Sequence, residues 1–350
     1  MHRECLLKDI PLDKRGIIHR FTHESDVLKD NFLKDPYIRE LAVYIPQGYN
    51  HEDKSKKYPV FLDLTGFAGC GLSHLNWEPF IPNFKDRLDY LIYTRKMGES
   101  IVIFPNTFTK YGGNQYLNSP AVGNYMDYII EEIVPFAEDK FNTYKNKNYR
   151  AVFGKSSGGY GALVHGLMKP DFLGAIACLS GGAYFESWKI THLYTARKVI
   201  ERHGCTLEGF FSYLEKNQHN LTLEEVYTLF IIASGATYAP DESQPFKFKL
   251  PFKNISTGEL DHSVLEKWYE KDPVRMLDTY GENLRKLKGI YIDCGIKDDL
   301  ICGNRILHKR LNELNILHEY QEFDDGHSDI DYRNHIRLPY LYKSLFPDFK

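Results

Sequence analysis

The pentapeptide 154–158, Gly-Lys-Ser-Ser-Gly, is the segment whose residue types most directly suggest chemistry, because it fits the pattern G-x-S-x-G. The short apolar run 151–153 precedes it, and small and aliphatic residues follow it. A strand that enters a helix through a tight turn lifts the central serine into a strained, exposed position. Flanking glycines keep a Cβ from colliding with the neighbouring strand or helix. We therefore expect a nucleophilic serine, which needs a histidine and a carboxylate from elsewhere in the chain.

Two other interpretations of this segment have to be weighed. The Gly-Lys-Ser triplet resembles the end of a phosphate-binding P-loop, but that motif needs a glycine five positions before Gly154, where Tyr149 stands. Two adjacent serines also compete for the role of nucleophile. Only Ser156 has glycines at both flanking positions of the pattern. Ser157 is expected instead to offer its backbone N–H to an oxyanion. The sequence therefore favours Ser156 as the nucleophile.

Partners for this serine follow in the order that the strand–turn–helix architecture requires, with the acid before the histidine. The segment 290–299 ends a predicted strand and supplies Asp298 and Asp299, of which we favour Asp298 while Asp299 stays open. Asp293 lies within the strand and is expected to be a structural hydrogen-bonder. His327 lies in a loop after the next predicted strand. One helix and one strand separate the acid from the histidine, which is enough chain for one crossover.

A second oxyanion donor is expected from the loop after an early strand. The apolar run 59–64 leads into the segment 65–71, which has three glycines that let the backbone turn an N–H toward the site. Phe67 is the candidate donor, paired with Ser157. A glycine-rich turn without a catalytic role is the alternative. Cys70 is expected near the pocket without being catalytic.

Alternating strand-like and helix-like segments predict an α/β fold with a mostly parallel central sheet and helices on both faces. Near-alternating polarity in the first 57 residues indicates antiparallel strands, whereas short, continuous apolar runs are typical of buried parallel strands. The predicted later strands are 59–64, 101–105, 151–153, 175–180, 290–295 and 318–323, and the predicted helices include 125–141, a segment through Leu163 and Leu167, and 306–314.

Residues 183–280 interrupt this rhythm and are predicted to form a mainly helical cap within a single domain of residues 1–350. Helix-like stretches occupy 195–214 and 222–234, and a passage rich in Pro, Phe and Lys follows at 240–252. Aromatic side chains of the insertion could line an acyl or aryl pocket or could simply form the core of the cap. These are Tyr184, Phe185, Trp188, Phe210, Phe211, Tyr213, Tyr227 and Phe230.

Composition narrows the class of protein. The 350 residues are 43% hydrophobic and 26% charged with a net charge of −3, which is typical of soluble globular proteins and gives no basic footprint for nucleic acid. No apolar run approaches the ~20 residues that span a bilayer. The first 16 residues lack the apolar stretch of a secretory signal, so a cytoplasmic location is the expectation. Six cysteines without C-x-x-C spacing are expected to be reduced thiols, and no zinc signature is present.

Several segments, taken in order, resemble the esterase D and feruloyl esterase-like family of α/β-hydrolases. The family includes S-formylglutathione hydrolases, acetylxylan and enterochelin esterases, and mycolyltransferases. The resemblance implies an α/β-hydrolase fold in which Ser156, Asp298 and His327 form the triad. It lies in SDVLKDNFLKDPYIRELAVYIPQGY (25–49), LTGFAG (64–69), GNYMDYIIEEIVPFAEDKF (123–141), GKSSGGYGAL (154–163), DPVRML (272–277), CGIKDD (294–299) and GHSD (326–329).

The chain departs from this family at the motif itself. Members often have G-H-S-M-G-G at the turn, whereas this chain has Lys155 and Ser157, and its early loop has threonine where many members have histidine. S-formylglutathione hydrolases are typically shorter and lack so large an insertion, which argues against that narrow activity.

The sequence predicts a serine carboxylesterase that acts on a small-molecule ester without a metal or organic cofactor. A thioesterase such as S-formylglutathione hydrolase and an acyltransferase are the enzymatic alternatives. A catalytically inactive binding module is the alternative outside catalysis, and an intact triad argues against it. The physiological ester and the oligomeric state, including a homo-oligomer, stay open.

Overall fold

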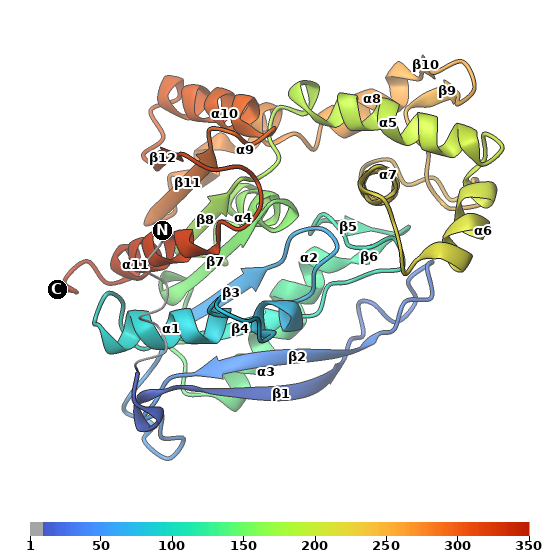
Figure 1. Ribbon diagram of the computed structural model, residues 1–350. Coiled ribbons are helices and arrows are strands. Elements are labelled where there is room, and N and C mark those ends of the chain that lie inside the picture. Colours follow the sequence, from blue (N-terminus) through green and yellow to red (C-terminus); the bar gives the residue numbers. More distant parts are fainter. Residues whose placement is uncertain (1–9, 350) are drawn as a thin grey trace.

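A central sheet organises the part of the chain that the computed structural model describes, residues 10–349 (Figure 1). It has eight strands in the order β1-β2-β4-β3-β7-β8-β11-β12. The first two strands pair antiparallel with each other, and β2 pairs antiparallel with β4, while all later neighbours are parallel. The strands are β1 (Ile17–Glu24), β2 (Ile38–Ile45), β3 (Val60–Leu64), β4 (Ile101–Pro105), β7 (Arg150–Lys155), β8 (Ala175–Leu179), β11 (Gly289–Gly295) and β12 (Glu319–Phe323).

Helices cover both faces of this sheet. One face packs against α1 (Phe84–Tyr93) and α11 (Asn334–Leu345), which contribute Phe84, Leu88, Leu338 and Leu341 to a buried cluster with Phe61 and Phe153 of the sheet. The other face packs against a second cluster. Its helices include α2 (Tyr125–Asp127), the π-helical η4 (Tyr128–Ile133), α3 (Val134–Lys140), α4 (Ser157–Met168), α9 (Pro273–Leu284) and α10 (Ile301–Glu313).

A group of elements between β8 and α9 lies beyond the edge of the sheet, at the upper right of Figure 1. Its two longest helices, α5 (Lys189–Arg202) and α7 (Leu223–Tyr238), pack against each other. The rest of the group comprises η6 (Phe185–Ser187), α6 (Leu207–Asn217), β9 (Phe252–Asn254), β10 (Glu259–Leu260) and α8 (His262–Tyr269). The predicted end of the cap at residue 280 falls inside α9, a helix that packs against α4.

Short elements complete the chain. A two-stranded ribbon of β5 (Asn118–Ser119) and β6 (Gly123–Asn124) precedes α2. The remaining 3₁₀ turns are η2 (Leu12–Lys14), η3 (Gly71–Leu75), η5 (Lys147–Tyr149) and η7 (Asp331–Arg333). Among the described residues, no helix is both long enough and apolar enough to cross a membrane.

The predicted fold class and central strands are confirmed, and the main corrections concern helix boundaries. The helix predicted over 195–214 is wrong, because α5 ends at Arg202 and α6 begins at Leu207. Gly204 adopts a φ of +81° between them, and the Thr206 side chain caps α6 by accepting from the Gly209 N–H at 3.1 Å. The helix predicted over 125–141 is interrupted by π-helical η4. The predictions for residues 1–9, including that of a reduced thiol at Cys5, lie outside the described part of the chain.

The turn between β7 and α4 packs so tightly against β3 that only glycine fits on either side of Ser156. A Cβ at Gly158 would lie 1.7 Å from the Leu64 carbonyl oxygen. A Cβ at Gly154 would lie 2.4 Å from the same oxygen and 2.4 Å from the Gly158 carbonyl carbon. Because these obstacles are backbone atoms, a side-chain rotation cannot relieve the clash. The two glycines of the motif are therefore required by packing.

Replacing Gly158 with alanine is predicted to destabilise the fold by about 3 kcal/mol or more, because the added methyl overlaps the Leu64 carbonyl. The matched control is Gly281→Ala in α9, where the nearest atom to the new Cβ would be Leu314 Cδ1 at 3.5 Å. That helix substitution is expected to be neutral or to stabilise by up to ~1 kcal/mol. The free energy of unfolding in urea measures both effects, and a Gly158→Ala variant as stable as the parent would contradict the packing argument.

Candidate active site

Ser156 sits at the apex of the turn between β7 and α4 in a strained backbone conformation, with φ 57° and ψ −120°. Such conformations cost roughly 1–3 kcal/mol and persist only where the surroundings enforce them. Here the Ser156 N–H donates to the Leu179 carbonyl of β8 at 3.0 Å, and its carbonyl accepts from the Tyr160 N–H at 2.9 Å. The backbone on both sides of Ser156 is thereby fixed, and the side chain is presented at the carboxyl edge of the sheet.

Arg337 of α11, on the face of the sheet opposite α4, supports the same turn. The guanidinium of Arg337 in α11 is 2% exposed and donates to the Gly154 carbonyl at 2.9 Å. Nearby, Asp293 of β11 accepts from Arg333 Nε at 2.8 Å and from the Tyr291 hydroxyl at 2.9 Å. These bonds agree with the structural role expected of Asp293. The Arg337–Gly154 hydrogen bond and the buried Arg333–Asp293 ion pair therefore tie α11 and the turn before it to the strands beneath the site.

His327 lies against Asp298 and not against Asp299. The His327 Nδ1–H donates to Asp298 Oδ2 at 2.8 Å, and the other Asp298 oxygen accepts from the Leu300 N–H at 2.9 Å. The Asp298 side chain is 1% exposed, the His327 side chain is 39% exposed, and Asp299 is exposed. Burial alone would raise the pKa of Asp298, but the hydrogen bond and charge of His327 together with the Leu300 N–H hold that pKa below its usual value.

Close approach of two loops brings this pair together. The His327 loop crosses over the end of β11 so closely that a Cβ at Gly295 would lie 2.2 Å from the Asp325 carbonyl oxygen. The Lys297 N–H donates to that same carbonyl at 3.0 Å. The glycine that ends β11 therefore lets the histidine loop settle beside Asp298.

The loop after β3 approaches the serine from the other side. A Cβ at Gly66 would lie only 3.5 Å from Ser156 Cβ, and the Ala68 N–H anchors the loop by donating to the Gly112 carbonyl at 2.8 Å. The Phe67 N–H has no hydrogen-bond acceptor among the described residues. Ser157 is the first residue of α4, where an N–H has no acceptor within the helix. Both predicted oxyanion donors are therefore available for a ligand.

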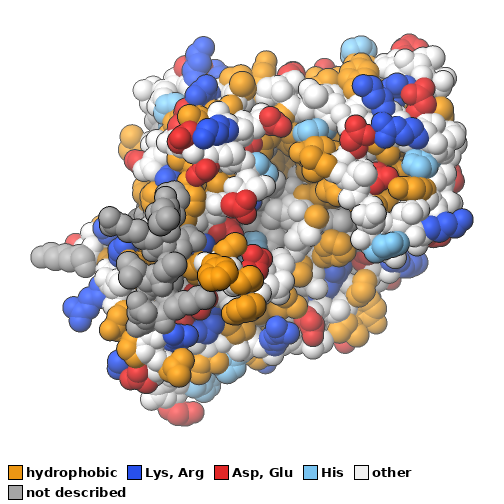
Figure 2. Space-filling view, in the orientation of Figure 1, with side chains coloured by type: hydrophobic (Ala, Val, Ile, Leu, Met, Phe, Trp, Pro, Cys, Tyr) orange, Lys and Arg blue, Asp and Glu red, His pale blue; other side chains and the backbone are white. Residues whose placement is uncertain are grey.

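These side chains meet in one cavity of about 390 Å³. Figure 2 shows a hollow in the molecular surface between the region of the central sheet and that of α7. Ser156, Asp298 and His327 line the cavity together with the predicted oxyanion residues Phe67 and Ser157. This volume falls in the range of small-molecule sites. Cys70 is not among the described residues that line it.

Three of the aromatic residues singled out from the insertion line this cavity, namely Trp188, Tyr227 and Phe230. The others do not line it, and Phe185 and Phe210 are instead fully buried within the hydrophobic core. Sequence reasoning missed several polar residues of the cavity, among them Gln115, Tyr160, Lys189 and His192. Gln115 Nε2 donates to the Ser157 hydroxyl at 3.1 Å across 42 residues of chain. No short-range pattern marks such a contact.

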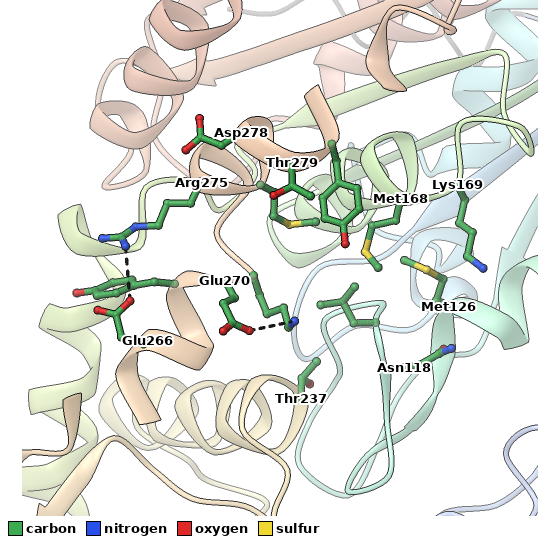
Figure 3. Close-up of a pocket in the computed structure, with 15 residues that line it drawn as sticks. Asn118, Met126, Met168, Lys169, Thr237, Glu266, Glu270, Arg275, Asp278 and Thr279 are labelled. Carbon is green, nitrogen blue, oxygen red and sulfur yellow. Dashed lines mark ion pairs between the residues drawn. The ribbon is translucent and has the colours of Figure 1, made fainter. Parts of the chain in front are cut away.

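A larger cavity, of about 830 Å³, lies elsewhere (Figure 3). Met126 and Met168 line one end, and ion pairs of Arg275 with Glu266 (3.9 Å) and Lys271 with Glu270 (3.7 Å) lie toward the other. Tyr160 separates it from the serine cavity, since its hydroxyl donates to the Lys271 carbonyl at 2.9 Å. The cavity of about 830 Å³ contains none of the five predicted site residues, so the smaller cavity is the candidate active site.

Buried cysteines do not compete with Ser156 as nucleophiles. Burial raises the pKa of the Cys178 thiol to about 12 and raises that of Cys294 as well. A thiol is reactive only as its thiolate, which such burial disfavours. Within residues 10–349, no group of three or more His, Cys, Asp or Glu side chains could hold a metal ion.

Comparisons with known proteins indicate the family and the fold of this chain. Two curated xylanases match parts of the chain. An endo-1,4-beta-xylanase/feruloyl esterase of Xylanibacter ruminicola is 29% identical over 147 residues, which is 41% of this chain and 19% of that protein. Endo-1,4-beta-xylanase Y of Acetivibrio thermocellus is 23% identical over 197 residues, covering 53% of this chain and 17% of that protein. The aligned parts therefore span less than a fifth of these relatives.

Solved structures share the fold over nearly the whole chain. A ferulic acid esterase aligns with a TM-score of 0.60 at 20% identity, covering 95% of this chain and 100% of its own. The fluorophosphonate-binding serine hydrolase F of Staphylococcus aureus gives 0.60 at 16% identity, with coverages of 95% and 99%. The S-formylglutathione hydrolase of Staphylococcus aureus gives 0.55 at 15% identity, with coverages of 94% and 99%.

Finally, the family model described as "Putative esterase" matches residues 38–337, a span that contains the turn at Ser156, both candidate acids and His327. The chain therefore belongs to this esterase family, and it has the α/β-hydrolase fold.

Proposed function

We propose that this enzyme hydrolyses carboxylic esters through an acyl-enzyme on Ser156. The single observation that carries the proposal is the convergence of a strained serine turn and a hydrogen-bonded His327–Asp298 pair on one cavity. Serine is a weak nucleophile at neutral pH and needs a base to take its proton. His327 is the base, because Asp298 fixes its Nδ1–H and leaves Nε2 free to accept.

The reaction proceeds in two steps, which are acylation of Ser156 and hydrolysis of the acyl-enzyme. His327 Nε2 takes the Ser156 hydroxyl proton as the serine oxygen bonds to the ester carbonyl carbon, and it then protonates the departing alcohol as the ester C–O bond breaks. A water molecule next gives one proton to His327 and attacks the acyl-enzyme. Collapse of that intermediate returns the proton to Ser156 and releases the carboxylic acid.

Electrostatic support comes from both ends of the site. Asp298 holds the imidazole in the productive tautomer and stabilises its protonated form. The N–H groups of Ser157 and Phe67 bind the oxyanion, and each is expected to contribute about 3 kcal/mol to lowering the barrier. The first turn of α4 adds its positive end to this charge stabilisation.

The substrate is a small-molecule ester whose acyl group occupies the cavity beside Trp188, Tyr227 and Phe230. Aromatic walls favour an extended or planar acyl group over a bulky one. The same groups could cleave a thioester or pass the acyl group to an acceptor other than water. A panel of p-nitrophenyl esters, feruloyl esters and S-formylglutathione distinguishes these reactions directly.

Ser156→Ala is predicted to abolish hydrolysis of p-nitrophenyl acetate while the far-ultraviolet circular dichroism and unfolding temperature stay close to those of the parent. Ser157→Ala is the matched control. It keeps the backbone N–H and loses only a hydroxyl bonded to Gln115, so it is expected to retain most of the activity. Activity that survives Ser156→Ala, or that is lost instead in Ser157→Ala, would contradict the choice of nucleophile.

Asp298→Asn is predicted to lower kcat by about 10⁴-fold, because an amide cannot hold His327 in the tautomer that accepts the serine proton. Asp299→Asn removes the same charge from the adjacent, exposed residue and is expected to change kcat little. Steady-state kinetics with one p-nitrophenyl ester measure both variants. Equal losses, or a larger loss in Asp299→Asn, would overturn the assignment of the acid.

A further inference from the structure

Lys189 is a buried cation in the wall of the active-site cavity, and the proposed hydrolytic mechanism gives it no role. It is the first residue of α5, is 1% exposed, and lines the cavity together with Trp188 and Phe230. Its Nζ donates to the Ser234 hydroxyl at 3.3 Å and to the Tyr238 hydroxyl at 3.1 Å, both on the neighbouring helix α7.

The lysine lies at the inner end of the cavity. The cavity follows one side of α7 through Leu223, Val226, Tyr227 and Phe230. Exposure falls along this side of the helix, from 66% at Leu223 to 7% at Phe230 and 0% at Ser234. Because Lys189 bonds to Ser234, its ammonium belongs to the closed end, and a ligand that enters past Leu223 would reach it last.

Aromatic rings surround the ammonium. The distance from Nζ to the ring centre is 4.2 Å for Phe185, 4.5 Å for Tyr238, 4.9 Å for Phe230, 5.1 Å for Trp188 and 5.8 Å for Trp268. Ring faces attract a cation, but they do not neutralise its charge or accept a strong hydrogen bond. The rings therefore leave a protonated Lys189 without a counter-ion and without an acceptor for its third N–H.

Charge compensation from the protein is weak. No carboxylate in residues 10–349 lies within ion-pair distance of Nζ. Asp272 is the carboxylate that acts on Lys189 through space, and its oxygens already accept from the Tyr184, Phe185 and Val274 N–H groups. Burial holds the pKa of Lys189 well below its usual value despite Asp272. Burial without a close counter-ion disfavours the charged form of Lys189, and an anion bound beside Nζ would favour that form.

Donors outnumber acceptors at this end of the cavity. An ammonium has three N–H groups, and Ser234 and Tyr238 account for two of them. The indole N–H of cavity-lining Trp188 is buried and has no acceptor among the described residues. Lys189 is also at the N-terminus of a 14-residue helix with no acidic residue in its first turn, a place that favours anions over cations. All three observations point to a missing anionic acceptor.

We propose that Lys189 binds a carboxylate at the far end of the substrate's acyl group, so that the enzyme prefers hemiesters of dicarboxylic acids. This inference rests on the proposed function. The acyl group is the part that occupies the inner cavity, because it stays attached to Ser156 in the acyl-enzyme while the alcohol must leave. A carboxylate supplies the counter-ion and accepts from both Lys189 and Trp188.

Hydrogen bonds also connect this anion site to the reaction centre. The Tyr238 hydroxyl accepts from Lys189 and donates to Gln115 Oε1 at 3.3 Å, and Gln115 Nε2 donates to the Ser157 hydroxyl at 3.1 Å. A bound carboxylate would therefore order a chain that ends at the proposed oxyanion donor. Occupancy of the site is expected to raise kcat as well as to lower KM.

The test compares matched substrates. The p-nitrophenyl hemiesters of glutaric, adipic, pimelic and suberic acid are paired with their neutral counterparts, in which the terminal carboxylate is replaced by its methyl ester. The parent enzyme is expected to show a kcat/KM about 10–100-fold higher for the anionic member at the best chain length. Lys189→Met, which keeps the side-chain length and apolar stem, is expected to remove this preference, measured as the ratio of kcat/KM for the charged and neutral esters within the same variant.

The matched control is Lys297→Met. Lys297 also lines the cavity, but it lies at the exposed rim and pairs with Asp324 at 2.8 Å. The preference for the anion should survive in this variant. Equal kcat/KM for charged and neutral esters at every length would overturn the proposal, as would a preference that persists in Lys189→Met or disappears in Lys297→Met.

Binding can be measured without catalysis. Monomethyl suberate and dimethyl suberate are titrated into the Ser156→Ala variant, with the intrinsic tryptophan fluorescence, to which cavity-lining Trp188 contributes, as the readout. Tighter binding of the anion, lost when Lys189→Met is added, is the expected result, and equal binding of the two esters would contradict the anion site. If the parent enzyme hydrolyses neither ester, the proposed function fails, and this titration still decides on the anion site separately.

Discussion

Contact between the Leu64 carbonyl and the first turn of α4 is the constraint on which the site depends. Gly158 has no room for a Cβ against that carbonyl, and Gly154 meets the same oxygen from the end of β7. This contact locks β3, β7 and α4 at one point on the carboxyl edge of the sheet. Since the loop after β3 begins at the next residue, the constraint that strains Ser156 also brings the loop that contains Gly66 and Phe67 close to its side.

The remaining parts of the site are arranged around this fixed point. From one face, α11 supports the turn through Arg337 and the Gly154 carbonyl, while β11 and β12 bring Asp298 and His327 from a separate crossover. From beyond the sheet edge, α5 and α7 supply the aromatic walls and the lysine. In the proposed mechanism, the reaction centre therefore belongs to the sheet, whereas the substrate-binding end belongs to the segment between β8 and α9. This division would let acyl selectivity change without disturbing the proposed nucleophile.

Sequence reasoning succeeded where local signals coincide with topology. Short apolar runs and glycines located the strands, and chain order then predicted that Ser156, an acid and His327 lie together, and they line one cavity. It could not choose firmly between Asp298 and Asp299, because the two are adjacent and only the direction of each side chain distinguishes them. The roles of Gln115 and Lys189 were inaccessible, since their partners lie 42 to 123 residues away along the chain. The break near Gly204 was missed because apolar periodicity continues across it.

The central claim is that Ser156 forms a covalent intermediate. The most direct measurement is to label the enzyme with a fluorophosphonate, which phosphonylates activated serines, and to locate the adduct by peptide mass spectrometry. We expect one adduct per chain, on Ser156, and strongly slowed labelling in Asp298→Asn. An adduct on Ser157 or on a serine outside the cavity, or no adduct on an enzyme that hydrolyses esters, would contradict the central claim.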